Sequence, residues 1–202
     1  MRDFRAETAD VKCWDRETHE VFERTGIPGV DHVLQNREEL IAFCEWIERN
    51  EIRSFLEIGI WTGGLLTLLS RLFRFDMLAA CDNLYAQSIG LPMSIPAGTL
   101  TFFGNSQSAA YEAWRAKLGH VDVVMIDGDH SYEGVRRDFE INRRYPHRFL
   151  VFHDIIGYHP MTDGVRRLWN ELDGDKTEIV LPHLEIGLEE PTMGIGIWRN
   201  PG

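Results

Sequence analysis

Hydrophobic positions along this chain fall into two arrangements that alternate, short continuous runs and longer runs with helical spacing. The continuous runs predict buried strands, which we expect at residues 54–58, 77–81, 100–103, 121–126, 149–152, 178–181 and 194–198. The runs with helical spacing predict helices at residues 63–73, 106–118, 132–145 and 164–172. One more helix is expected to begin after Asn36, a residue suited to an N-cap.

A regular alternation of strand and helix is typical of parallel βαβ units. The sequence therefore predicts an α/β fold, a Rossmann-like doubly wound and mostly parallel seven-stranded sheet with helices on both faces. No helix separates the last two predicted strands. We expect them to form an antiparallel C-terminal strand pair at one edge of the sheet.

The least patterned parts of the chain are residues 1–35 and residues 83–98. We expect residues 1–35 to be an N-terminal extension with short helical pieces, packed on one domain that spans residues 36–202. Residues 83–98 contain two glycines and two prolines and predict a long loop. A loop of this length in a compact domain is often a lid or a binding loop.

Charge and cysteine content narrow the class of protein. The 202 residues suffice for one domain, and the net charge of -11 argues against nucleic acid or an anionic membrane as a partner. No apolar stretch approaches the roughly 20 residues of a membrane helix, and the N-terminus lacks the apolar segment of a signal peptide. Cys13, Cys44 and Cys81 are widely spaced, so we expect buried free thiols and a cytoplasmic protein.

The first candidate site follows the first predicted strand, in Glu57-Ile-Gly59-Ile-Trp-Thr-Gly63-Gly64. Glycines at a strand-to-helix turn let the backbone approach a ligand closely. Their spacing differs from the dinucleotide fingerprint, and no lysine follows Gly64 as it would in a phosphate-binding P-loop. Because Glu57 would repel phosphate and favour an amine, Glu57, Gly59 and Gly63 are expected to bind an amine-bearing cofactor.

Polar residues also follow the next two strands. Asp82, at the end of the second strand, can accept hydrogen bonds from two ribose hydroxyls, and Asn105 and Ser106 after the third can contact the edge of a base. The carboxyl ends of parallel strands meet at one edge of a sheet. We therefore expect these residues to line the same cofactor site as the glycine turn.

The densest group of reactive side chains follows the fourth strand, as Asp127-Gly-Asp129-His130, and His153-Asp154 follows the fifth. Inside a strand such groups would carry a large desolvation cost, whereas at the mouth of the sheet they remain hydrated. This placement predicts a catalytic site with acid, base and metal-ligand candidates.

Together these motifs resemble those of class I S-adenosylmethionine-dependent methyltransferases. Glu57-x-Gly59-x-x-x-Gly63 matches the loop that surrounds the methionine part of the cofactor in that family, and Asp82 stands where its members hold the ribose. Residues 126–135 and 151–154 resemble small bacterial methyltransferases akin to macrocin O-methyltransferase and to proteins labelled cephalosporin hydroxylase. The resemblance spans roughly residues 36–200. It implies S-adenosylmethionine as the cofactor, with Asp127 among the residues around it.

The resemblance also implies a divalent metal. In such relatives an Asp at the position of Asp127 and an acidic pair after the next strand hold magnesium, and a His three residues after that Asp is the base in some members. Carried over, Asp127, His153 and Asp154 are the metal ligands, His130 is the catalytic base and Asp129 is the other candidate base. Relatives often carry an acid where this chain has His153. Because imidazole is a poorer magnesium ligand than carboxylate, a softer ion such as manganese also fits.

The predicted function is O-methylation of a hydroxyl on a sugar or other small natural product, with a metal as a possible assistant. Methyl transfer to nitrogen, or to a protein or peptide, stays open, as does an inactive cofactor-binding protein. An oxygenase with iron on His and Asp also stays open, although Glu57 and Asp82 favour an amine- and ribose-bearing ligand over 2-oxoglutarate. Such relatives are often oligomeric, so the resemblance implies a homo-oligomer with residues 1–35 as a natural contact.

Overall fold

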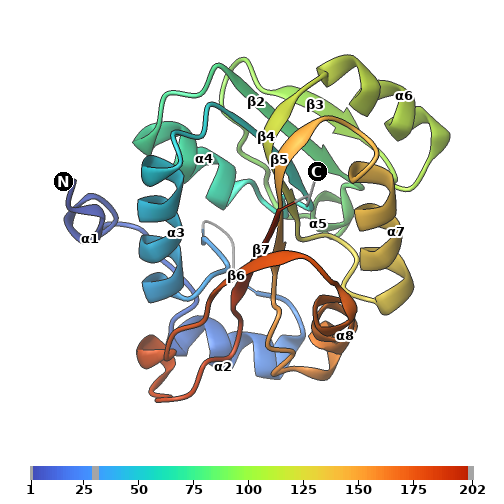
Figure 1. The fold of residues 1–202 in the computed structure, drawn as a ribbon. Helices are drawn as coiled ribbons and strands as arrows, with labels where there is room; N and C mark the ends of the chain where they lie inside the picture. The colour runs from blue at the N-terminus through green and yellow to red at the C-terminus, as the bar shows by residue number, and fades with distance from the viewer. Residues whose placement is uncertain (1, 29–31, 200–202) are drawn as a thin grey trace.

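The computed structural model describes residues 2–28 and 32–199, and within them seven strands form one sheet (Figure 1). Its strand order is β3-β2-β1-β4-β5-β7-β6. Strands β1 to β5 pair in parallel, whereas β7 is antiparallel to both β5 and β6, which confirms the predicted fold class. The strands are β1 (Ser54–Ile58), β2 (Met77–Asp82), β3 (Leu100–Phe103), β4 (Val121–Ile126), β5 (His147–His153), β6 (Asp175–Ile179) and β7 (Ile195–Arg199).

Helices connect the strands and also form part of the N-terminal segment. In the described ranges they are α1 (Phe4–Glu7), α2 (Arg16–Thr25), α3 (Arg37–Arg49), α4 (Gly64–Leu72), α5 (Tyr85–Ser88), α6 (Ala109–Leu118), α7 (Tyr132–Asn142) and α8 (Asp163–Glu171). Two short 3-10 helices, η1 (Pro160–Thr162) and η2 (Leu184–Ile186), follow β5 and β6. The Asn36 side chain accepts a hydrogen bond from the Glu38 amide at 3.0 Å, so the predicted N-cap of α3 is confirmed.

The sheet is covered on both faces, and each face has its own apolar core. Helices α1, α3 and α4 pack on one face around residues such as Phe43, Leu66 and Phe55. Helices α6, α7 and α8 cover the other face, where Phe139 and Trp169 pack against Phe152 (Figure 1). A doubly covered sheet leaves its carboxyl edge as the natural place for a ligand.

Most element boundaries differ from those predicted by one to three residues, and three differences have a clear physical reason. Strand β6 lies at 175–179 rather than 178–181, because a mostly polar edge strand pairs through its backbone with β7 and shows no hydrophobic run. Helix α6 begins at Ala109 rather than 106, because the Ser108 hydroxyl accepts a hydrogen bond from the Tyr111 amide and caps the helix there. The predicted loop at 83–98 contains the short helix α5.

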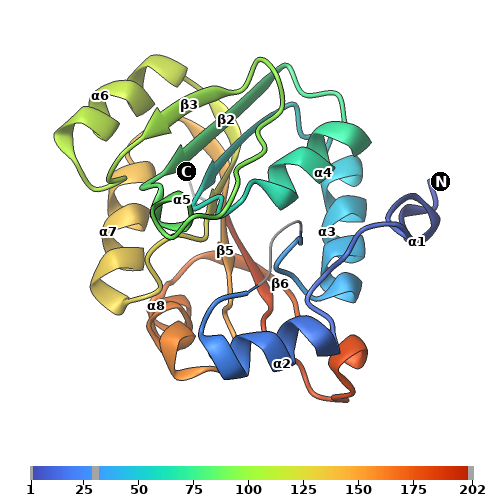
Figure 2. The same ribbon diagram turned by 180° about the vertical axis from the view of Figure 1, so that it is seen from behind.

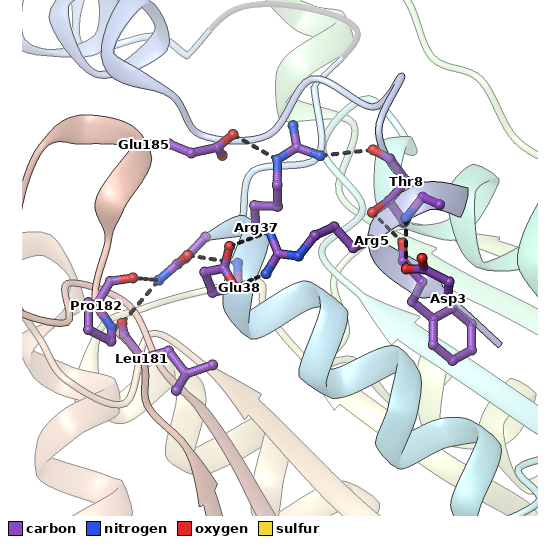
Figure 3. A network of polar contacts seen from close by, with 11 residues as sticks. Asp3, Arg5, Thr8, Arg37, Glu38, Leu181, Pro182 and Glu185 are labelled. Carbon is purple, nitrogen blue, oxygen red and sulfur yellow. Dashed lines mark hydrogen bonds and ion pairs between the residues drawn. The ribbon is translucent and has the colours of Figure 1, made fainter. Parts of the chain in front are cut away.

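The N-terminal segment is tied to the start of α3. The Arg37 guanidinium donates to the carbonyl of Thr8 at 2.8 Å and pairs with Glu185 at 2.7 Å (Figure 3). It also donates to the carbonyl of Val11 at 2.6 Å. The neighbouring Asn36 amide donates to the carbonyls of Leu181 and Pro182, both at 3.1 Å. Residues 8–11 and residues 181–185 are therefore both anchored at the start of one helix.

The structure bears on two expectations from composition. Cys13, Cys44 and Cys81 are buried and free of disulfides, as predicted. Among the described residues, no helix combines the length and the apolar character needed to cross a membrane.

Candidate active site

A cavity of about 820 Å³ opens at the carboxyl edge of the sheet. Its walls come from residues that follow β1, β2, β3, β4 and β5, from α2, and from the segments around η1 and η2. Helix α2 lies beside η2 and near α8 at the same end of the molecule in both views (Figures 1 and 2). Each of the sequence-predicted site residues except Gly63 lines this cavity.

The glycine turn after β1 is held by close backbone contacts. Gly59 has φ +85°, and a Cβ there would lie 2.2 Å from the carbonyl oxygen of Asp127. Gly63, at φ +86°, begins α4, and a Cβ there would lie 2.0 Å from the carbonyl oxygen of Ser94. Glycine is required at both positions because these approaches are to protein backbone. The turn is thereby fixed against β4 on one side and the 83–98 segment on the other.

Two acids flank this turn in different surroundings. Asp82 accepts backbone hydrogen bonds from Ile60 at 2.9 Å and Leu84 at 2.5 Å, which fixes its carboxylate at the cavity wall. Glu57 is 3% exposed, and its Oε2 has no hydrogen-bond partner among the described residues. Burial, then the charges of Asp127 and Asp82, raise the pKa of Glu57 well above its usual value. A cationic group of a ligand would favour its ionised form.

The base-edge candidates lie in the segment after β3. Asn105 and Ser106 both line the cavity, and the Asn105 side chain accepts a hydrogen bond from the Gln107 amide at 2.7 Å. Gln107 also lines the cavity, and its side chain donates to the carbonyl of Gly134 at 3.3 Å. Sequence reasoning missed Gln107, although it directly follows the two residues it singled out.

Four side chains converge beyond β4 and β5. The Nε2 atom of His130 lies 3.2 Å from Asp127 Oδ1 and 3.4 Å from Asp154 Oδ2. The Nδ1 atom of His153 lies 3.5 Å from the same two oxygens. Asp154 takes φ +63°, a left-handed conformation that is uncommon outside glycine and that accompanies the turn of its carboxylate into the cluster. Two carboxylates and two imidazoles thus share one small volume.

The contacts between the carboxylates and the imidazoles of this cluster shift the pKa values of three of its residues. Burial opposes the charged forms, but the two carboxylates outweigh it and raise the pKa of His153 well above the usual histidine value. The same balance raises the pKa of His130. Conversely, burial acts against ionisation of Asp127, but the charge of His153 and the hydrogen bond with His130 lower its pKa below the usual range. Asp127 is therefore ionised, the form in which it can bind a cation.

The donor set fits a divalent cation. One ligand atom from each of Asp127, His153 and Asp154 lies within 4.8 Å of the others. Two carboxylates and one imidazole suit manganese and tolerate magnesium. The ring Nε2 of His153 is buried without a hydrogen-bond partner among the described residues, so Nδ1 is the atom that faces the carboxylates.

Asp129 lies apart from this cluster. Its side chain is exposed, and Oδ1 accepts a hydrogen bond from the Ser131 amide at 2.9 Å. It also packs over the first turn of α7, where a Cβ on Gly134 would lie 2.2 Å from its Cγ. In the described part of the chain, no ion pair joins Asp129 to either histidine. The structure thus groups His130 with the candidate metal ligands and places Asp129 at the rim.

The site lies in a stretch of the chain that is similar to a known protein family. Residues 56–155 match the family model described as a methyltransferase domain. This stretch is a methyltransferase domain, and the chain has the fold of class I S-adenosylmethionine-dependent methyltransferases. The matched stretch contains every residue that the sequence analysis assigned to the site, from Glu57 to Asp154.

Solved methyltransferases share the fold of this domain. An O-methyltransferase from Bacillus cereus, solved with SAH, has a TM-score of 0.56 at 14% identity and covers 91% of this chain and 89% of its own. TomG from Streptomyces achromogenes, solved with SAM, has a TM-score of 0.55 at 14% identity and covers 92% and 87%. MycE of the mycinamycin pathway, solved with Mg, SAH and mycinamycin VI, has a TM-score of 0.55 at 17% identity and covers 90% and 54%.

One curated relative matches by sequence. It is an uncharacterized protein of Acanthamoeba polyphaga mimivirus, 24% identical over 140 residues, which are 63% of this chain and 59% of the relative. This chain therefore spans less than two thirds of the length of that relative. The comparison adds no activity of its own.

Proposed function

We propose that this methyltransferase transfers a methyl group from S-adenosylmethionine to a hydroxyl of a small natural product such as a sugar, with a divalent cation held by Asp127, His153 and Asp154. The observation that carries the proposal is the position of the His/Asp cluster beside the glycine turn. The Asp127 amide donates to the carbonyl of Ile58 at 2.9 Å, so a backbone hydrogen bond joins the cluster to the residue that directly precedes the glycine turn. Structural neighbours solved as O-methyltransferases support oxygen as the acceptor atom.

The cofactor fits along the walls after β1, β2 and β3. Asp82 is fixed by two backbone amides and is suited to accept hydrogen bonds from both ribose hydroxyls. Asn105 and Ser106 would contact the adenine edge at one end of the cavity. Glu57 and Gly59 would enclose the methionine part, with Gly63 fixing the turn behind them, and the methyl group would then lie on the side of Asp127 and the cluster.

Methyl transfer is an in-line displacement at the sulfonium carbon. The acceptor oxygen must lie about 3 Å from that carbon and must lose its proton. A bound divalent cation lowers the pKa of a hydroxyl that coordinates it. His130 lies within reach of both metal-ligand carboxylates. A cation bound to these carboxylates would offset the charge that raises the pKa of His130 and would favour its neutral ring, so we assign His130 as the base that accepts the proton. Asp129, at the rim of the same cavity, is the second candidate.

Cation binding can be tested without an acceptor. Titration of Mn²⁺ and Mg²⁺ into chelator-treated protein, followed by calorimetry, should show one site that is tighter for Mn²⁺. Asp154→Asn should weaken Mn²⁺ binding at least tenfold, or about 1.4 kcal/mol, because one of two anionic ligands becomes neutral. Asp76→Asn, at the opposite end of the sheet, is the control. Equal Mn²⁺ affinity in Asp154→Asn and the parent protein would rule out this site.

The two candidate bases can be separated by rate. Transfer of labelled methyl from S-adenosylmethionine to vicinal diols should fall by roughly 10²–10⁴ in His130→Ala, because a positioned base contributes about that factor. Asp129→Asn should retain transfer within a few fold and keep cofactor affinity. The reverse pattern would assign the base to Asp129.

A further inference from the structure

Further described residues line the cavity besides those assigned to the cofactor and the cation. Trp14 and Phe22 of the N-terminal segment line it, as do His159 and Gln35. From this half of the cavity we infer that the N-terminal segment builds the acceptor subsite, and that it takes an uncharged ring compound with two neighbouring hydroxyls and a carbonyl or amide that Gln35 binds. This inference rests on the proposed methyl transfer and specifies its substrate class.

Gln35 is the residue that most directly indicates a ligand. It is 2% exposed and lines the cavity, yet neither Nε2 nor Oε1 has a hydrogen-bond partner among the described residues. A buried amide without partners carries a desolvation cost that a ligand can remove. An amide offers both a donor and an acceptor, which suits a carbonyl or carboxamide.

Three aromatic rings line the same cavity as this amide, and we term them the aromatic wall: Trp14, Phe22 and His159. The rings of Trp14 and Phe22 are 5.2 Å apart at 66°, and those of Phe22 and His159 are 5.6 Å apart at 73°. Such edge-to-face contacts keep the rings in place and leave ring faces for a planar or sugar ring to pack on. Tyr158 and Met161, 53% and 62% exposed, continue the wall toward the mouth.

The wall is preorganised by bonds to the rest of the protein. The Trp14 amide donates to the carbonyl of Gln35 at 3.1 Å, so these two residues are fixed to each other. The buried His183 ring lies 2.8 Å from the Trp14 carbonyl and 2.6 Å from the Thr192 hydroxyl. Arg37 holds the residues before Trp14 through its bonds to the carbonyls of Thr8, drawn in Figure 3, and Val11. The N-terminal segment is thus part of the site rather than a loose extension.

The charge of the cavity selects against anions. Within residues 2–28 and 32–199, no lysine or arginine lines it. Six acidic residues do, namely Glu23, Glu57, Asp82, Asp127, Asp129 and Asp154. Carboxylate and phosphate ligands are typically held by arginine or lysine, and in the half of the cavity lined by Phe22 they would meet the neighbouring Glu23 of α2 instead. An acceptor that carries phosphate, carboxylate or a coenzyme A moiety is therefore disfavoured.

A matched set of catechols tests the charge and the amide together. We would measure calorimetric binding of 3,4-dihydroxybenzamide, 3,4-dihydroxybenzoate and catechol to the protein loaded with Mn²⁺ and SAH. The benzamide should bind tightest, catechol more weakly, and the benzoate at least tenfold more weakly than the benzamide. Equal or tighter binding of the benzoate, or no binding of the benzamide, would overturn the inference.

The variant Gln35→Leu isolates the role of the amide. It should remove the preference for the benzamide over catechol and leave SAH affinity unchanged, an outcome that a purely structural role would not produce. Should Gln35→Leu fail to fold, Gln35→Met provides the same test with an unbranched chain. A preference that survives either substitution in a folded protein contradicts the assignment.

The two proposals fail in different ways. Loss of SAH binding by the parent protein would reject the methyltransferase function itself. Normal SAH binding without the expected ranking of the three catechols would reject only the acceptor subsite.

Discussion

At the residue scale, strand register explains why the His/Asp cluster could be predicted. Ile126 of β4 pairs with Phe152 of β5 in parallel, so the residues that follow, Asp127 and His153, emerge side by side. Any sequence that ends two neighbouring parallel strands in such residues brings them together. The position of His130 depends on a turn whose path no hydrophobic pattern specifies, and only the structure shows its ring between the two carboxylates.

Gln35 and Trp14 mark the limit of prediction at this scale. Neither belongs to a motif, and residues 1–35 show weak periodicity. Their position follows from contacts between distant parts of the chain, such as that of His183 with the Trp14 carbonyl. Short-range patterns carry no signal for such contacts. The segment holds only three aromatic residues, Phe4, Trp14 and Phe22, so its composition gave no signal either.

One buried acid outside the cavity makes a prediction about stability. Asp138 of α7 is 0% exposed, and its carboxyl oxygens have no hydrogen-bond partner among the described residues. Burial, and to a smaller extent the nearby Asp129, raise its pKa to about 6. The folded protein therefore holds a proton that the unfolded chain releases near pH 4, and stability from this group is lost as pH rises from about 4 to about 6.

Asp138→Asn should remove that loss. We expect the variant to match the parent at pH 4 and to be more stable at pH 8 by on the order of 1–3 kcal/mol, measured by urea denaturation. Asp175→Asn, at the exposed start of β6, should leave the pH profile unchanged. Identical profiles for Asp138→Asn and the parent protein would show that Asp138 is not protonated in the fold.

At the scale of elements, strand prediction was best where the strand carries a run of apolar residues. The bounds of β1, β3 and β4 match those predicted, although β3 is mostly exposed whereas β1 and β4 are buried along their whole length. Strand β6 was displaced because its edge position leaves Asp175, Thr177 and Glu178 exposed and so removes the hydrophobic run. Helix α5 was missed because four residues in a segment rich in glycine and proline give no period to read. The division at residue 35 stays a prediction.

Two glycines, one before α4 and one in the 83–98 segment, allow a matched pair of substitutions. Gly63 and Gly90 have nearly the same φ, +86° and +88°, so alanine is strained at both. At Gly90 an added Cβ meets nothing within 4 Å, whereas at Gly63 it lies 2.0 Å from the Ser94 carbonyl oxygen. Gly90→Ala should cost about 1 kcal/mol of unfolding free energy, and Gly63→Ala should cost at least about 3.

The measurements are urea denaturation and calorimetric titration of S-adenosylmethionine. Because Gly63→Ala must displace the 83–98 segment from the glycine turn, it should also weaken cofactor binding, whereas Gly90→Ala should not. Equal stability losses in the two variants would mean that the contact with Ser94 does not hold the turn.

At the scale of the whole molecule, residues near the N-terminus meet residues 181–185 at the start of α3. Asn36 contacts Leu181 and Pro182 across about 145 positions of sequence, and Arg37 joins Thr8 to Glu185 (Figure 3). The sequence predicted the sheet, its carboxyl edge and an N-terminal segment packed on the domain, but not that residues within 186–193 would also line the cavity. Substrate selection in this account therefore belongs to the parts of the chain that lie outside the matched methyltransferase stretch.

The central claim is that the carboxyl edge of the sheet binds S-adenosylmethionine through Asp82. It is tested most directly by calorimetric titration of S-adenosylmethionine into the parent protein, Asp82→Ala and Asp76→Ala. These two acids lie at opposite ends of β2, so only the first reaches the cavity. We expect micromolar binding by the parent and Asp76→Ala, and at least tenfold weaker binding, about 1.4 kcal/mol, by a folded Asp82→Ala. Absence of binding by the parent protein, or unchanged affinity in Asp82→Ala, would contradict the account.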